Sequence, residues 1–171
     1  MVSLVAAHWP LLLFGLMIVG LTIAALVSLR DGPPPYERRG VLLTPPEIAL
    51  LRALQHAVRE DWLIFSMVRL ADIIKVRPRT RKFQTWHSRI QGKLLDFVLC
   101  DPQTLDVKLA IVLDDGTPHP PTAAEQRFIA AALAAAGIPL LRIRAEEKYE
   151  TAALRKDLED ALGITRKKKR A

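Results

Sequence analysis

Two apolar segments in the middle of the chain are interrupted or followed by acidic residues. Residues 94–100 and 107–113 are short runs rich in Val, Ile, Leu and Phe with an Asp-Pro dipeptide between them, so they predict two buried strands joined by a turn. Asp96 lies inside the first run, and Asp114 and Asp115 follow the second. A carboxylate in a buried strand is costly unless it is hydrogen-bonded, paired or bound to a metal. We therefore expect these acids to have a specific role.

Helix-spaced apolar residues and helix-start signals surround the two strands. Thr44, Pro45 and Glu47 predict a capping box with proline at the first helical position, and Thr122 and Glu125 predict a second box. The pattern predicts an α/β domain with the order helix, strand, helix, strand, strand, helix, strand, helix. The expected helices are 44–60, 83–90, 122–136 and 150–162, and the aromatic residues of 83–90 are expected in the core. The other expected strands are 138–144 and the start of 62–74. The end of 62–74 is either a short helix or a second extended piece.

The N-terminal segment is apolar enough to cross a membrane. Residues 10–29 contain no charged side chain, and about 20 apolar residues span a bilayer as a helix. A cleaved signal peptide is the alternative, but the run is longer than usual for one and no basic region precedes it. Trp9 stands where an interfacial aromatic residue is expected, and basic residues follow the segment at Arg30, Arg38 and Arg39. This asymmetry predicts a single-pass protein of the inner (cytoplasmic) membrane with its C-terminal domain in the cytoplasm.

Composition divides the chain into four parts. We expect a transmembrane anchor at 1–30, a linker rich in Pro and Gly at 31–42, a folded domain at 43–163 and a basic tail at 164–171. The single cysteine excludes an intrachain disulfide, and the formal net charge of +7 favours anionic partners. Glycine-rich phosphate loops, zinc-binding spacings and the nucleophile motif of hydrolases are absent from the sequence.

Basic residues concentrate in one loop, between the predicted strand at 62–74 and the helix at 83–90. With Phe83 and Trp86 beside them, they suit contacts to phosphate and stacking on bases; the alternative is a solvated loop near anionic lipid headgroups. The basic tail allows contact with anionic lipid or nucleic acid, or a solubilising end. The loop residues are Lys75, Arg77, Arg79, Arg81 and Lys82.

Three segments carry a resemblance to a known family. The sequences KLLDFVLCDPQTL, LAIVLDD and AALAAAGIPLLRI, in this order and spacing, resemble the bacterial domain of unknown function 2726 over residues 43–162. That family is related to very-short-patch-repair and restriction-endonuclease-like nucleases. The resemblance implies a restriction-endonuclease-like mixed sheet flanked by helices, with one N-terminal transmembrane helix, and a metal site of the PD-(D/E)-x-K type.

Such a site uses carboxylates to hold Mg²⁺, which activates water and neutralises charge on the phosphate. The resemblance assigns the first acid to Asp96 and the second strand's acid to Asp114, with His119 near the position of a catalytic histidine. For Lys93 the residues leave open a phosphate contact or a solvated position. Val112 occupies the position of the family's central glutamate. Alternation along a strand places Val112 and Asp114 on one side, so the site keeps Asp114 and loses that ligand.

The family's Arg-Asp pair at the start of the next helix is Glu125-Gln126 here. The residues alone leave structural roles open: Asp96 caps a strand or pairs with Lys93 or Arg142, and the other acids belong to turns. We therefore expect a membrane-anchored, degenerate nuclease-like domain that binds nucleic acid without cleaving it. One alternative is an active Mg²⁺-dependent nuclease, in which Asp96 and Asp114 are sufficient or a third acid comes from elsewhere, such as Glu47 or Glu60 on the first helix. The other is a scaffold at the inner membrane.

Overall fold

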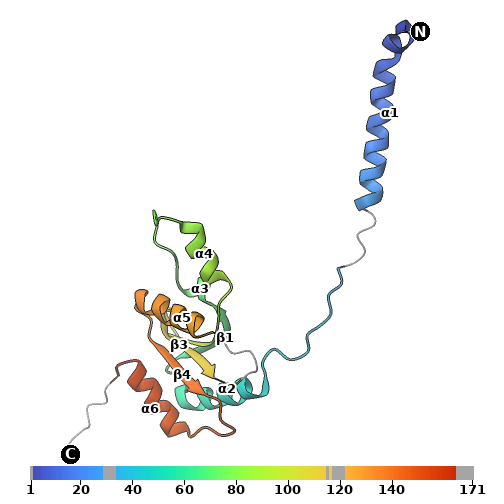
Figure 1. Ribbon diagram of the computed structural model, residues 1–171. Helices are drawn as coiled ribbons and strands as arrows, with labels where there is room; N and C mark the ends of the chain where they lie inside the picture. The colour runs from blue at the N-terminus through green and yellow to red at the C-terminus, as the bar shows by residue number, and fades with distance from the viewer. Residues whose placement is uncertain (1, 29–33, 115, 117–121, 165–171) are drawn as a thin grey trace, which may run out of the picture. The chain divides into compact units, whose positions relative to one another are not determined.

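The computed structural model describes residues 2–28, 34–114, 116 and 122–164 (Figure 1). They belong to two compact units, Met1–Gly40 and Val41–Ala171. Among the residues singled out by sequence, Arg30, Asp115, His119 and the basic run 166–170 lie outside the described residues.

The first unit contains one long helix. Helix α1 (Val2–Ser28) starts eight residues before the predicted 10–29 and continues through Pro10. Its segment His8–Ser28 is long and apolar enough to span a membrane by length and composition. Residues 34–43 are without regular helix or strand, as the Pro-rich sequence predicts.

The second unit is built on a four-stranded mixed sheet with the order β1-β2-β3-β4. Its strands are β1 (Leu63–Arg69), β2 (Leu94–Cys100), β3 (Val107–Asp114) and β4 (Leu140–Arg144). Strands β1, β2 and β3 pair antiparallel, whereas β4 lies parallel to β3 after a crossover through helix α5 (Ala123–Ala135). The α/β prediction and the positions of all four strands are confirmed.

Helices cover both faces of the sheet (Figure 1). Helices α2 (Pro45–Val58) and α6 (Thr151–Ala161) pack on one face, where Phe97 lies fully buried at the centre of the core. On the other face, α5 packs beside α3 (Leu70–Ile73) and α4 (Phe83–Gln91). The middle strand β2 is therefore apolar on both sides, which explains its nearly continuous hydrophobic sequence.

At the two predicted helix starts, side chains close in sequence form capping hydrogen bonds. The Glu47 carboxylate accepts hydrogen bonds from the Thr44 backbone N–H and hydroxyl, at 2.6 and 2.8 Å. At α5 the exchange is reciprocal, because Thr122 Oγ1 accepts from the Glu125 N–H at 3.2 Å and the Glu125 carboxylate accepts from the Thr122 N–H at 3.0 Å. Gly137, with φ of +75°, follows the end of α5.

Residues 70–93 leave the sheet after β1 and return to it at β2, and we call this stretch the α3–α4 excursion. Of the two alternatives for the end of 62–74, the structure has the short helix, α3. The Leu70 N–H donates to the Lys93 carbonyl at 2.8 Å, which joins the two ends of the excursion. Leu70 and Ile90 are buried with the α5 core, so the excursion is held to the sheet by its base.

Candidate functional site

Asp96 lies where the pairing between β2 and β3 ends. Strand β2 pairs with β1 from Leu94 to Cys100, with a gap at Asp96, whereas its pairing with β3 extends only as far as Phe97 and Ile111. One residue beyond, Asp96 Oδ2 accepts the backbone N–H of Leu113 at 2.7 Å. The carboxylate thus takes the place of a strand carbonyl, so Asp96 has the structural role that the strand-capping alternative predicted. Its role as a metal ligand stays a prediction.

Backbone geometry changes at the same point of the sheet. Met67 and Asp96 fall between the register pairs Ser66–Phe97 and Val68–Leu95 and are not paired themselves, and Met67 has φ of +55°, unusual for a residue with a side chain. Leu95 and Val98 pack on the α5 face although strict alternation would place them on opposite faces. The alternation of side chains along β2 is therefore interrupted near Asp96. Its side chain reaches the Leu113 N–H of β3.

Val112 and Asp114 lie at the end of β3, beside β4. Val112 packs against the apolar α5-face core and stands next to Arg142 in the parallel register, while Asp114 is exposed next to Arg144. Among the described residues, no three His, Cys, Asp or Glu side chains are grouped to hold a metal ion. Of the three carboxylates in the resembled pattern, the described residues supply two, Asp96 and Asp114, and Val112 stands at the third position. These residues do not complete a metal site, and we derive no catalytic step through a metal.

The two positions that differ from the resembled Arg-Asp pair each have a partner here. Glu125 forms an ion pair with Lys93, and Gln126 accepts from Arg142 through its side-chain oxygen at 3.0 Å and its carbonyl at 3.2 Å. The hydrogen bond from Lys93, with those from Thr122, lowers the pKa of Glu125 to about 2, so the carboxylate stays charged well below neutral pH. These contacts connect the start of α5 to β2 and β4.

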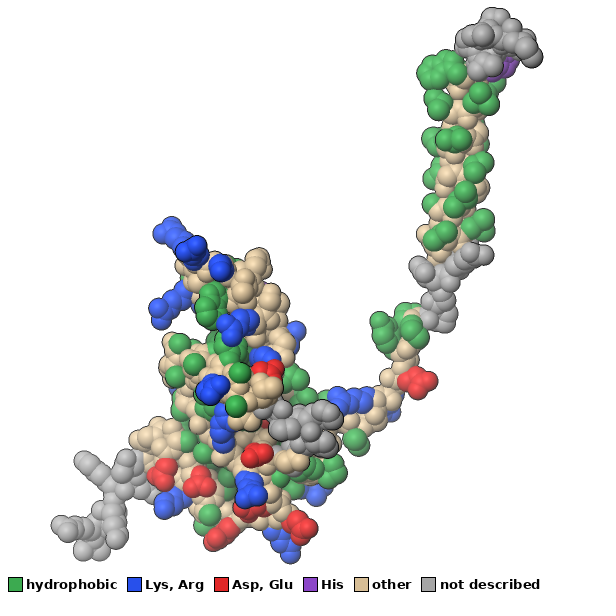
Figure 2. All heavy atoms as spheres, viewed as in Figure 1, with side chains coloured by type: hydrophobic (Ala, Val, Ile, Leu, Met, Phe, Trp, Pro, Cys, Tyr) green, Lys and Arg blue, Asp and Glu red, His purple; other side chains and the backbone are tan. Residues whose placement is uncertain are grey.

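The five basic residues of the loop 75–82 have no acidic residue near them in the sequence. Between Asp72 and Asp96 the sequence contains seven Lys or Arg residues and no Asp or Glu. All five predicted contact residues, from Lys75 to Lys82, are exposed, and none forms a salt bridge within the described part of the chain. Figure 2 shows Lys and Arg side chains gathered over this excursion.

The basic loop, residues 75–82, contains a hydrogen-bonded turn. The Thr80 N–H and hydroxyl both donate to the Arg77 carbonyl, at 3.3 and 2.6 Å. Arg79 and Lys82 have φ of +61° and +60°, a conformation that costs about 1 kcal/mol or more for residues with a side chain. The hydrogen bonds and left-handed residues therefore form a turn before α4, and its cations are exposed.

The aromatic residues of α4 were predicted to lie in the core, and this prediction is wrong. Phe83 and Trp86 are 40% and 44% exposed, because α4 buries only Ile90 against the sheet and its first turns extend beyond it. The Phe83 ring stacks on His87 with centroids 5.8 Å apart, and the Arg89 guanidinium lies 5.2 Å from the Trp86 ring. The excursion thus combines exposed rings with exposed cations.

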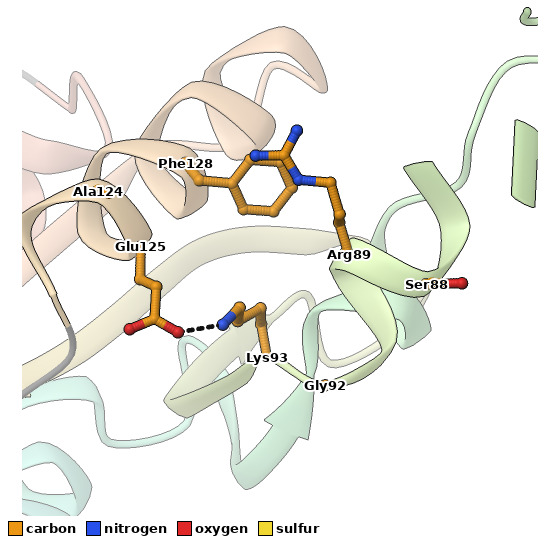
Figure 3. A pocket seen from close by; sticks show the side chains of 7 residues that line it. All are labelled: Ser88, Arg89, Gly92, Lys93, Ala124, Glu125 and Phe128. Atoms are coloured by element: carbon orange, nitrogen blue, oxygen red, sulfur yellow. Dashed lines mark hydrogen bonds and ion pairs between the residues drawn. The ribbon is translucent and has the colours of Figure 1, made fainter. Parts of the chain in front are cut away.

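A pocket of about 330 Å³ opens between α4, the start of β2 and the start of α5 (Figure 3). Arg89 extends over the Phe128 ring at 4.4 Å, and the Lys93–Glu125 pair lies at the opposite side of the pocket. Sequence reasoning proposed Lys93 as a phosphate contact but missed Arg89, Glu125 and Phe128 as its neighbours. The seven lining residues are Ser88, Arg89, Gly92, Lys93, Ala124, Glu125 and Phe128.

Comparisons with known proteins identify the second unit by family. A family model described as "Protein of unknown function (DUF2726)" matches residues 39–162. This range contains all four strands and the helices α2 to α6, and it excludes α1. No curated protein and no solved structure matches the chain.

Replacing Asp96 by alanine should destabilise the domain more than replacing it by asparagine. Alanine leaves the part-buried Leu113 N–H without its acceptor, at a cost of about 1–3 kcal/mol, whereas an asparagine oxygen can still accept. Urea unfolding of the full chain in detergent micelles measures the difference. Equal stability of Asp96→Ala and the unchanged protein would contradict the structural role of this carboxylate.

Proposed function

We propose that this chain, which belongs to the DUF2726 family, is a nucleic-acid-binding protein that α1 anchors in a membrane and whose nuclease-like site has lost its central metal ligand. The mixed sheet with helices on both faces supports the restriction-endonuclease-like interpretation, since it is the architecture that the resemblance implies. The sequence departures at 112, 125 and 126 support loss of cleavage.

The observation that carries the proposal is the group of cations in the loop 75–82, none of which forms a salt bridge in the described part of the chain. Phosphate contacts by Lys and Arg dominate the affinity of nucleic-acid-binding proteins, and they require cations that acidic neighbours do not neutralise. The excursion supplies five exposed cations in eight residues, from 75 to 82, without a salt bridge in the described part of the chain. A turn fixed by Thr80 and Arg77 presents them together.

Exposed rings next to these cations favour a single strand as the ligand. Bases of single-stranded nucleic acid stack on aromatic side chains, with about 1–3 kcal/mol per base, and the stacking tolerates any sequence. Phe83 and Trp86 follow the basic loop directly and are substantially exposed. A duplex hides its base faces, so neither ring would have a base to stack on.

Removing charge from the loop should weaken binding to a single-stranded oligonucleotide. The triple variant Arg77→Gln, Arg79→Gln, Arg81→Gln should bind a 20-nucleotide DNA at least about tenfold more weakly, because three phosphate contacts are lost. Fluorescence anisotropy on the full chain in non-ionic detergent measures the affinity.

The matched control removes three exposed cations from other surfaces, at Arg52, Arg127 and Lys156, and should change the affinity much less. Equal losses in both triple variants would show that net charge alone determines binding. Loss of binding to vesicles containing phosphatidylglycerol, with no binding to the oligonucleotide, would assign the loop to a lipid surface instead.

Restoring the central acid should restore metal binding. We expect no Mn²⁺ binding by the unchanged protein and measurable binding by Val112→Glu, because a third carboxylate would then stand on the same side of β3 as Asp114. Calorimetry on the full chain measures it. Binding by the unchanged protein that Asp96→Asn abolishes would support the active-nuclease alternative.

Helix α1 should hold the protein in the membrane. The full chain should remain in the membrane pellet after alkaline extraction, whereas a variant without residues 1–40 should appear in the supernatant. The reason is that, among the described residues, His8–Ser28 is the one helix with the length and hydropathy of a span. Release of the full chain by alkali would contradict an integral anchor.

A further inference from the structure

The pocket between α4 and α5 contains two cations and one anion. Arg89 and Lys93 approach it from the end of the α3–α4 excursion, and Glu125 approaches it from the first turn of α5. Its volume of about 330 Å³ lies at the lower end of the range for small-molecule sites and is large enough for a phosphate group with part of a nucleotide. The net positive charge of the lining favours an anion.

Arg89 is held in a position that leaves its hydrogen-bond donors available. Its guanidinium lies 4.4 Å from the Phe128 ring and 5.2 Å from the Trp86 ring. Within the described residues it forms no salt bridge and no side-chain hydrogen bond. The contacts with the two rings hold the guanidinium in place, and its N–H groups remain available to bind phosphate oxygens.

Lys93 forms an ion pair with Glu125, and Glu125 also has other hydrogen bonds. Its ammonium donates to Glu125 Oε1, while Glu125 Oε2 accepts from the Thr122 N–H and hydroxyl at 3.0 and 3.1 Å. Glu125 would therefore keep its capping bonds if Lys93 turned toward a ligand. A phosphate can compete for this lysine because it offers more charge than a single carboxylate.

We propose that this pocket binds the terminal phosphate of the nucleic-acid strand held by the basic loop; this rests on the proposed function. Loop and pocket lie at the two ends of one helix, since α4 begins after Lys82 and ends just before Lys93. A terminal phosphomonoester carries close to two negative charges at neutral pH, which match Arg89 and Lys93. A pocket also suits a strand end, whereas an internal phosphodiester needs a groove open at both sides.

Three oligonucleotides of the same sequence test the proposal on the full chain in detergent: one with a 5′-phosphate, one with a 3′-phosphate and one with hydroxyls at both ends. We expect one phosphorylated form to bind at least about tenfold more tightly than the hydroxyl form. Equal affinities for all three would overturn the pocket assignment and leave the proposed function standing. Absence of binding by all three would overturn both.

Variants distinguish recognition of the terminal phosphate from a general structural effect. The measured quantity is the ratio of the affinity for the preferred phosphorylated oligonucleotide to that for the hydroxyl form, and a general loss of binding leaves this ratio unchanged. Lys93→Gln and Arg89→Gln should each bring that ratio close to one. Glu125→Gln should raise it, since glutamine retains the capping position but no longer competes for Lys93. Arg127→Gln, an exposed neighbour on α5 outside the pocket, should leave it unchanged. A lower ratio in Glu125→Gln would overturn the proposed competition.

Discussion

The hydrogen bond from the Leu113 N–H to the Asp96 carboxylate closes the sheet at the point where its two central strands stop pairing. Without an acceptor there, a part-buried backbone donor would be left unsatisfied between two apolar layers. Because the Asp96 carboxylate accepts this N–H, the pairing of β2 with β3 can end at Phe97. The α3–α4 excursion can then join β2 at Lys93. The acid that looked like a metal ligand in the sequence thus also has a role in the architecture.

Most of the fold could be predicted from local patterns. Short apolar runs give the four strands, and the capping residues Thr44 and Thr122 place two helix starts, because both signals act between residues close in sequence. The exposure of Trp86 could not be predicted, since a ring at helical spacing looks the same whether or not another layer covers it. Helix α1 also begins before the apolar run 10–29 and passes through Pro10, because a run defined by the absence of charge does not mark where a helix starts.

The candidate site was only partly predictable for the same reason. The sequence indicates the acids and the basic loop, but the pocket depends on Arg89 meeting Phe128 across two helices that are far apart in the chain. The contacts of Glu125 and Gln126 give a physical meaning to their departure from the resembled pattern. Here they connect α5 to Lys93 and Arg142.

The charged loop, the exposed rings of α4 and the pocket form a continuous series along one excursion from the sheet. The central claim, that this excursion binds nucleic acid through phosphates, is tested most directly by the salt dependence of single-strand binding. If five cations contact phosphates, log K plotted against log salt concentration should have a slope of about −3.5. A slope near zero, or no binding at low salt, would contradict the claim.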